Sequence, residues 1–85
     1  MVTQTATLND PEGFHMRPAG VFAAKMANFK STVTLSAGGK DVDGKSLMQI
    51  MSCGWKCGTE ITVTCEGEDE AEALAAAVEG IEAVA

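Results

Sequence analysis

Residues 32–43, Thr-Val-Thr-Leu-Ser-Ala-Gly-Gly-Lys-Asp-Val-Asp, decide the fold of this chain. Apolar and polar side chains alternate along the first half of the stretch, which is the period of a β-strand with one buried face. Gly38-Gly39 is a two-residue turn signal between antiparallel strands. The last four residues then form a short returning strand with Val42 as its apolar member. The stretch predicts a β-hairpin in a sheet with one wet face.

Two further segments read as strands of the same sheet. Residues 61–65 alternate as Ile-Thr-Val-Thr-Cys, and residues 2–8 are rich in threonine and end in Leu8. Threonine and β-branched residues favour strands, and short runs bounded by turn residues favour antiparallel pairing. We therefore expect four strands in all.

A helix is predicted between the first two strands. Pro18 suits a first-turn position, because that position needs no backbone N–H. Phe22, Met26 and Phe29 recur at i, i+4 and i+7 and mark one helical face. This pattern predicts a helix that runs to about residue 28.

Two more helices are predicted in the second half of the chain. Ser46 is a good N-cap residue, and Gly54 is a plausible terminator of the short helix that follows it. The last helix should begin at Glu68 or Asp69, where negative charge suits the N-terminal dipole. Its buried stripe is predicted from helical spacing to consist of Leu74, Val78 and Ile81.

The predicted order is β-α-β-β-α-β-α within a single domain, residues 1–85. One-sided alternation in the strands leaves one wet sheet face, so the helices must cover the other. We therefore expect an α+β open-faced two-layer sandwich. Its four-stranded sheet should be mainly antiparallel, with three helices on one face.

The formal net charge of −6 argues against nucleic acid as a partner, because phosphate backbones attract Lys and Arg. No apolar run approaches the roughly 20 residues that span a bilayer, so no membrane insertion is expected. No basic segment leads into an apolar stretch as in a secretory signal. We expect a cytoplasmic protein.

Charge is distributed unevenly along the chain. Acidic residues gather in residues 60–82, whereas residues 15–45 hold five of the six basic residues. A locally positive face is therefore compatible with an acidic whole. The acidic residues at 66–72 are expected to be a solvated helix start.

The chain contains three cysteines, Cys53, Cys57 and Cys65. Cys53 and Cys57 form a C-x3-C pair, but no second pair accompanies it and the spacing is not C-x2-C. We therefore expect no metal site. Reduced cysteines that behave as small buried hydrophobes are the simpler interpretation.

His15 is the candidate reactive residue. It follows a loop and precedes a helix, whose N-terminus presents unpaired N–H groups and a positive dipole end. Arg17 adds a permanent cation with forked donors that suit phosphate oxygens. Neutral imidazole is a competent nucleophile. These features are compatible with a phosphoryl acceptor, although a histidine near a helix start is weak support by itself.

Residues 13–19, Gly-Phe-His-Met-Arg-Pro-Ala, resemble the active-site signature of HPr, the histidine-containing phosphocarrier of the bacterial phosphoenolpyruvate:sugar phosphotransferase system. Residues 44–48 and 51–54 resemble the second motif of that family, around its regulatory serine. Residues 58–70 resemble its last strand and the start of its last helix. The resemblance covers essentially the whole chain, in register.

The resemblance implies a phosphocarrier role without a cofactor. His15 would accept a phosphoryl group on Nδ1 from phosphorylated enzyme I, whose donor is phosphoenolpyruvate, and pass it to IIA domains of sugar permeases. Arg17 would stabilise the transferred group, with phosphate-binding help from backbone around Met16 and Pro18. Such a protein is an intermediate in a transferase cascade rather than a stand-alone enzyme, and it is expected to be a monomer.

The resemblance also assigns roles to the second motif. Leu47, Met48 and Met51 would form an apolar docking patch for enzyme I and the IIA domains, with Ile50 as the core member of the short helix. Ser46 would be phosphorylated by an HPr kinase/phosphorylase. The phosphorylated form would then bind a catabolite-control transcription factor.

Several features depart from the family pattern or leave alternatives open. Glu12, Phe14 and Met16 replace residues more usual near the histidine, and Glu12 could alter the pKa of His15 or repel a phosphate. No function is assigned to Trp55. The alternatives are a regulatory binding module acting through phosphorylated Ser46, a carrier for a nitrogen-linked chain or a dihydroxyacetone kinase, and a small structural domain.

Overall fold

The computed structural model describes residues 1–9 and 16–82, and of Met16 and Pro18 it describes the backbone alone. Its elements follow the predicted order. They are β1 (Val2–Thr7), α1 (Met16–Met26), β2 (Thr32–Ala37), β3 (Lys40–Asp43), α2 (Leu47–Cys53), β4 (Glu60–Glu66) and α3 (Glu70–Glu82).

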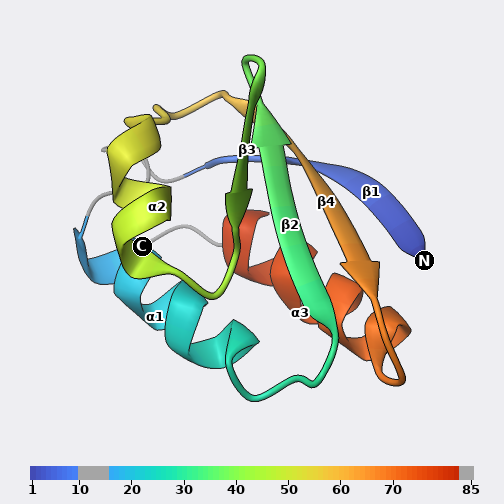
Figure 1. Cartoon of the computed structure of the whole chain (residues 1–85). Helices are drawn as coiled ribbons and strands as arrows, with labels where there is room; N and C mark the ends of the chain where they lie inside the picture. The colour runs from blue at the N-terminus through green and yellow to red at the C-terminus, as the bar shows by residue number, and fades with distance from the viewer. Residues whose placement is uncertain (10–15, 83–85) are drawn as a thin grey trace.

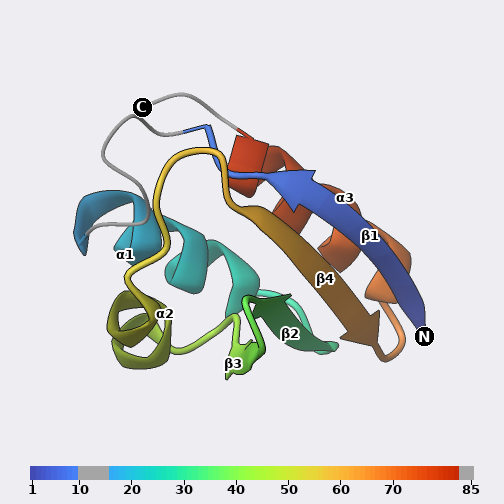
Figure 2. The same cartoon turned by 90° about the horizontal axis from the view of Figure 1, so that it is seen from above.

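The strands form one sheet in the order β1-β4-β2-β3, and all three pairings are antiparallel (Figure 1). Helix α3 runs behind the sheet and packs on β1, β4 and β2. Helix α1 contacts both α3 and α2, and α2 packs against β3 (Figure 2). This arrangement is the predicted open-faced sandwich.

The sheet has one buried face and one wet face, as the alternation predicted. Val33 lies beside Cys65, and Leu35 lies beside Val63, with all four side chains fully buried. On the opposite face, threonine hydroxyls from β1 and β4 lie 3.3 Å apart in two cross-strand pairs, Thr3 with Thr64 and Thr5 with Thr62. Cross-strand pairs of this kind stabilise a sheet on its solvent side.

The β2–β3 turn confirms the glycine signal. Gly38 and Gly39 adopt φ values of 58° and 81°. Positive φ at both central residues matches the right-handed twist of the flanking strands, and glycine reaches it without a Cβ clash.

Two details of the helix prediction were wrong. Helix α1 ends at Met26, so half-buried Phe29 lies beyond it in a turn closed by a bond from its N–H to the Met26 carbonyl. The buried residues of α3 are Ala73, Ala77 and Ile81, whereas Leu74 and Val78 are half-buried against the core. Small alanines thus occupy two of the three buried positions, where they let the helix pack closely.

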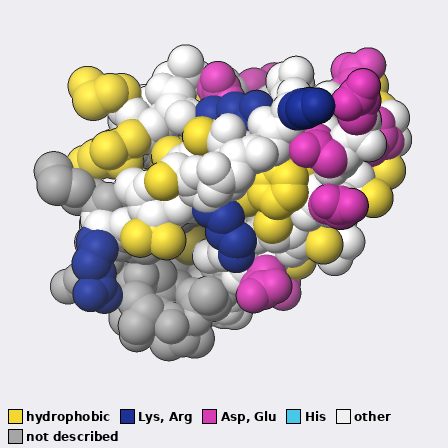
Figure 3. Space-filling model, turned by 90° about the horizontal axis from the view of Figure 1, so that it is seen from below, with side chains coloured by type: hydrophobic (Ala, Val, Ile, Leu, Met, Phe, Trp, Pro, Cys, Tyr) yellow, Lys and Arg dark blue, Asp and Glu magenta, His cyan; other side chains and the backbone are white. Residues whose placement is uncertain are grey.

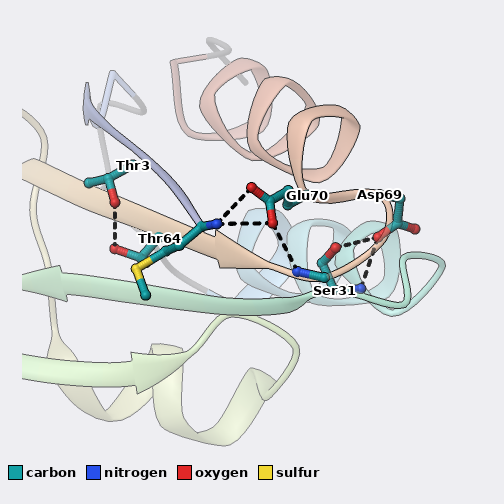
Figure 4. Close-up of polar contacts among 7 residues, drawn as sticks. Thr3, Ser31, Thr64, Asp69 and Glu70 are labelled. Carbon is teal, nitrogen blue, oxygen red and sulfur yellow. Dashed lines mark hydrogen bonds and ion pairs between the residues drawn. The ribbon is translucent and has the colours of Figure 1, made fainter.

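The acidic start of α3 is only partly solvated, which corrects the prediction for Asp69. Its carboxylate accepts hydrogen bonds from the backbone N–H groups of Lys30 and Ser31, both at 2.9 Å, and from the Ser31 hydroxyl (Figure 4). Ser31 is fully buried. These donors, the Ser31 hydroxyl first and the Lys30 N–H second, lower the pKa of Asp69 to about 2.

Glu70 is the second acidic residue whose carboxylate is held by polar contacts. Its carboxylate lies 2.9 Å from the ammonium group of Met1 and accepts a bond from the Gly67 N–H at 3.3 Å. The hydrogen bond from the Met1 ammonium is the main cause that lowers the pKa of Glu70. The neighbouring acidic residues Glu66, Glu68 and Glu72 are exposed, as predicted.

Candidate functional site

The N-terminus of α1 carries the described part of the predicted phosphoryl site. His15 lies outside the described residues, as do Glu12 and Phe14. Arg17 is exposed in the first turn of α1, and that turn contains no acidic residue. An exposed guanidinium and the positive end of an 11-residue helix therefore share one place, which favours an anion there.

Helix α2 begins as the sequence predicted. Ser46 is the N-cap with φ −107° and ψ 106°, and its Oγ accepts a hydrogen bond from the Gln49 N–H at 3.3 Å. At the other end Gly54 adopts the left-handed conformation with φ 62°. Because the side chain of Ser46 is half-buried and caps α2, it has a structural role whether or not the residue is phosphorylated.

The loop before Ser46 is held by its own backbone and by β2. The Gly44 N–H donates to the Val33 carbonyl at 2.8 Å. A Cβ on Gly44 would lie 2.7 Å from Val33 Cγ1, so only glycine allows this approach. Asp43 accepts from the Lys45 N–H at 2.9 Å through Oδ1, and from the Ser46 N–H at 3.0 Å through its carbonyl.

Lys45 joins this loop to the turn after α1. Its ammonium group donates a hydrogen bond to the Phe29 carbonyl at 2.7 Å, and the side chain is half-buried. The contact fixes the position of α2 relative to α1. Sequence reasoning missed it, because a lysine beside a capping serine has no distinctive pattern.

Helices α1 and α2 expose apolar side chains. Met48 is 79% exposed and Met51 37% exposed, while Ile50 is fully buried, as predicted. Leu47 is half-buried. Val21 of α1 is 65% exposed and was not predicted. Its position one residue before buried Phe22 places it outside the core-facing stripe, which is the signal that could have found it.

Apolar, basic and acidic side chains share the face seen from below. Yellow side chains occur at the left, on the side of α1 and α2, and again to the right of centre, while acidic ones lie chiefly toward the right-hand end (Figure 3). Basic side chains lie among the apolar ones on this face. The predicted locally positive face is thus compatible with the surface, despite a net charge of −6.

The cysteines behave differently from one another. Cys65 is buried, and burial raises the pKa of its thiol. Cys53 is half-buried and its thiol donates to the Gln49 carbonyl at 3.4 Å, whereas Cys57 is exposed, contrary to the prediction of buried cysteines. Within residues 1–9 and 16–82, no group of three or more His, Cys, Asp or Glu side chains could hold a metal ion.

A family model described as the PTS HPr component phosphorylation site matches residues 2–83. The chain belongs to the HPr family. It is 42% identical over 74 residues to the HPr-like protein Crh of Bacillus subtilis, covering 87% of each chain. It is also 38% identical over 76 residues to the phosphocarrier protein HPr of Mycoplasma capricolum, covering 89% of this chain and 85% of that one.

A solved structure supports the same assignment. HPr from Thermoanaerobacter tengcongensis superposes with a TM-score of 0.90 at 36% identity, covering 95% of this chain and 91% of that chain. Family membership supports a general phosphocarrier role in the phosphotransferase system. None of the described helices is both long and apolar enough to cross a membrane.

Proposed function

We propose that this HPr-family chain carries a phosphoryl group on His15, received from phosphorylated enzyme I and passed to IIA domains of sugar permeases. The observation that carries the proposal is the exposed Arg17 at the start of α1, two residues after His15 in a chain of this family. The proposal includes a single HPr-like domain over residues 1–85 that acts as a monomer in the cytoplasm.

The transfer chemistry needs positioning and charge stabilisation more than an acid or base. The bond between phosphorus and the donor breaks as the bond to His15 Nδ1 forms, and the reverse exchange occurs with the IIA acceptor. The Arg17 guanidinium supplies donors to the phosphoryl oxygens. Backbone around Met16 and Pro18, at the positive end of α1, supports the same charge.

Leu47, Met48 and Met51 are proposed to form the docking patch for enzyme I and the IIA domains. The two methionines are exposed, and Arg17 of the proposed site lies on the neighbouring helix α1, which contacts α2. Unbranched, polarizable methionine adapts to several partners.

Regulation through Ser46 is a second candidate function, favoured by the similarity to Crh and by the position of Ser46 beside Met48. An HPr kinase/phosphorylase would phosphorylate Ser46, and a catabolite-control transcription factor would bind the product. A phosphate there adds negative charge next to the docking patch and weakens binding of an acidic partner.

Incubation with enzyme I and phosphoenolpyruvate tests the main proposal. We expect an acid-labile, base-stable phosphate that is lost in His15→Ala and transferred slowly by Arg17→Ala. Failure of the parent protein to label with a competent enzyme I contradicts the proposal. A separate incubation with HPr kinase and ATP tests Ser46, and equal labelling of the parent and Ser46→Ala contradicts regulation at that residue.

A further inference from the structure

Strand β1 leaves one edge of the sheet open. The strand order β1-β4-β2-β3 makes β1 and β3 the two edge strands (Figure 1). An edge strand presents a row of backbone N–H and C=O groups that another extended chain can pair with. The two edges of this sheet differ in how well they are protected.

The direction of the backbone groups of β1 follows from two hydrogen bonds just beyond its end. The Leu8 N–H donates to the Thr59 carbonyl at 2.9 Å, and the Leu8 carbonyl accepts from the Gly58 N–H at 2.7 Å, so the backbone N–H and C=O of Leu8 point toward the β4 side. Since the direction of these backbone groups alternates along a strand, the N–H and C=O groups of Thr3, Thr5 and Thr7 point away from β4. The Thr7 N–H agrees with this direction, because it donates to Glu82 Oε2 at 3.4 Å and not to β4.

Thr3 and Thr5 therefore form the open part of the edge. Both residues are exposed, and among the residues that the structure describes nothing pairs with their outward N–H and C=O groups. Their hydroxyls bond across to β4 on the wet face, so the side chains do not cover the edge.

The opposite edge is protected in the usual way. Strand β3 has four residues, three of them charged: Lys40, Asp41 and Asp43. Strand β1 has six residues, Val-Thr-Gln-Thr-Ala-Thr, with no charge and no proline. Short, charged edge strands resist pairing, whereas uncharged strands of high β-propensity invite it.

Negative charge surrounds the open edge. The two elements that pack on β1 carry two glutamates in β4 and four in α3, and neither these two elements nor β1 contains a lysine or arginine. Glu60 lies beside Thr7 at one end of the strand, where the Glu82 carboxylate also accepts a hydrogen bond from the Thr7 N–H. At the other end Glu70 is ion-paired with the Met1 ammonium, so its charge is offset there (Figure 4). A strand that pairs with β1 therefore meets its strongest negative potential at the Thr7 end.

The geometry points to β1 as the docking edge for an extended, net-basic segment of a partner protein, which adds a strand to the sheet beyond β1. The segment would pair with Thr3 and Thr5 through its backbone, and its basic side chains would face Glu60, Glu66 and Glu82. A second copy of this chain is a poor occupant, because its own acidic elements would face the same glutamates. The edge lies across the sheet from β3 and α2, so it can be occupied together with the proposed docking patch.

The probe is a capped, fluorescent peptide of sequence Lys-Lys-Thr-Val-Thr-Val-Thr-Lys-Lys, titrated with the full chain. We expect saturable binding that weakens as salt is raised, with amide shifts and slowed hydrogen exchange centred on Thr3 and Thr5. A peptide with glutamate in place of lysine should not bind. Shifts centred on α1 and α2 instead, or equal binding of the acidic peptide, overturn the proposal.

Thr5→Pro is the decisive variant. It removes an outward N–H at a position where proline is tolerated in sheets, without touching the backbone bonds to β4. The hydroxyl contact with Thr62 is lost both in this variant and in the Thr5→Val control. We expect binding to fall by at least about tenfold, as the loss of backbone hydrogen bonds to the guest requires, while Thr5→Val binds like the parent. Unchanged binding by a folded Thr5→Pro overturns the proposal.

A modified probe makes the test independent of whether Thr5→Pro folds. The same basic peptide, N-methylated at alternate residues, keeps its charge but cannot donate to the edge. It should bind the parent chain at least about tenfold more weakly. Equal binding of the two peptides shows attraction by charge alone and overturns strand addition. The proposal is also overturned if, without peptide, the parent chain sediments as a dimer and Thr5→Pro sediments as a monomer, because the edge would then be occupied by a second copy.

Discussion

The ammonium group of Lys45 donates a 2.7 Å hydrogen bond to the backbone carbonyl of Phe29, which joins the loop before α2 to the turn after α1. Through this bond, the residue next to Ser46 is linked to the turn that follows α1, the helix that carries Arg17.

Lys45→Met should therefore lower the free energy of unfolding by about 1 kcal/mol, because a half-buried carbonyl loses a charged donor while the aliphatic stem is kept. Urea unfolding monitored by circular dichroism measures the change. Lys40→Met, at an exposed site in β3, is the control and should stay within about 0.5 kcal/mol of the parent. Equal effects of the two substitutions would show that the Phe29 contact adds nothing.

Ser46→Ala should cost about 1 kcal/mol of stability, because the Gln49 N–H loses its capping acceptor. Ser46→Asp should keep most of that stability, since aspartate is an equally good N-cap. If Ser46 is regulatory, Ser46→Asp should also slow phosphorylation of His15 by enzyme I, whereas Ser46→Ala should not. Chemical denaturation measures the first effect and initial phosphorylation rates the second. Two variants with the same rate argue against regulation by charge at this residue.

Local pattern predicted most of this fold, because each element carried its own signal. The alternation in residues 32–37, the glycine pair at 38–39 and the serine cap at 46 depend on neighbours in sequence, and the structure shows all three. Contacts between distant segments carried no such signal. Lys45 with Phe29 and Asp69 with Ser31 join residues 16 and 38 positions apart, so no spacing rule reveals them.

The buried side of α3 shows a second limit of sequence reasoning. Ranking by hydrophobicity selects Leu74 and Val78, but the positions buried together with Ile81 are Ala73 and Ala77, where small side chains let the helix pack closely. For the site, sequence predicted the cap at Ser46 and the exposure of Met48. It missed exposed Val21, whose apolar side chain resembles a core residue.

Gly44→Ala tests the close approach to β2. A Cβ would lie 2.7 Å from Val33 Cγ1 and 3.3 Å from the Val33 carbonyl oxygen, so the loop must shift. We expect a loss of about 1 to 3 kcal/mol. Gly20→Ala in α1 is the matched control, because nothing lies within 4 Å of its new Cβ, and it should gain about 0.5 to 1 kcal/mol from helix propensity. Thermal or urea unfolding separates the two, and loss of stability in both variants would contradict the steric argument.

The Asp69 carboxylate makes stability depend on pH in the acid range. Its pKa falls from the ordinary 3.8 to about 2 in the folded chain, so the folded state favours the ionised form. This contribution is fully present above about pH 4 and is lost as the pH falls toward 2. In Asp69→Asn the free energy of unfolding should be lower at pH 6 and should depend less on pH between 4 and 2. Urea titrations at several pH values measure this, and parallel pH profiles of the two proteins would contradict the assignment.

Met48→Glu tests the docking patch without disturbing the core. Because the Met48 side chain is 79% exposed, the substitution should change stability by no more than about 0.5 kcal/mol. If this side chain docks on enzyme I, the substitution should raise the KM for this chain by about tenfold or more, because it removes an apolar contact and adds charge to the interface. Ala75→Glu, at an exposed site in α3, adds the same charge elsewhere and should leave the KM near that of the parent. A similar rise in both variants would show an effect of net charge alone, and no rise in Met48→Glu would place the enzyme I contact on another surface.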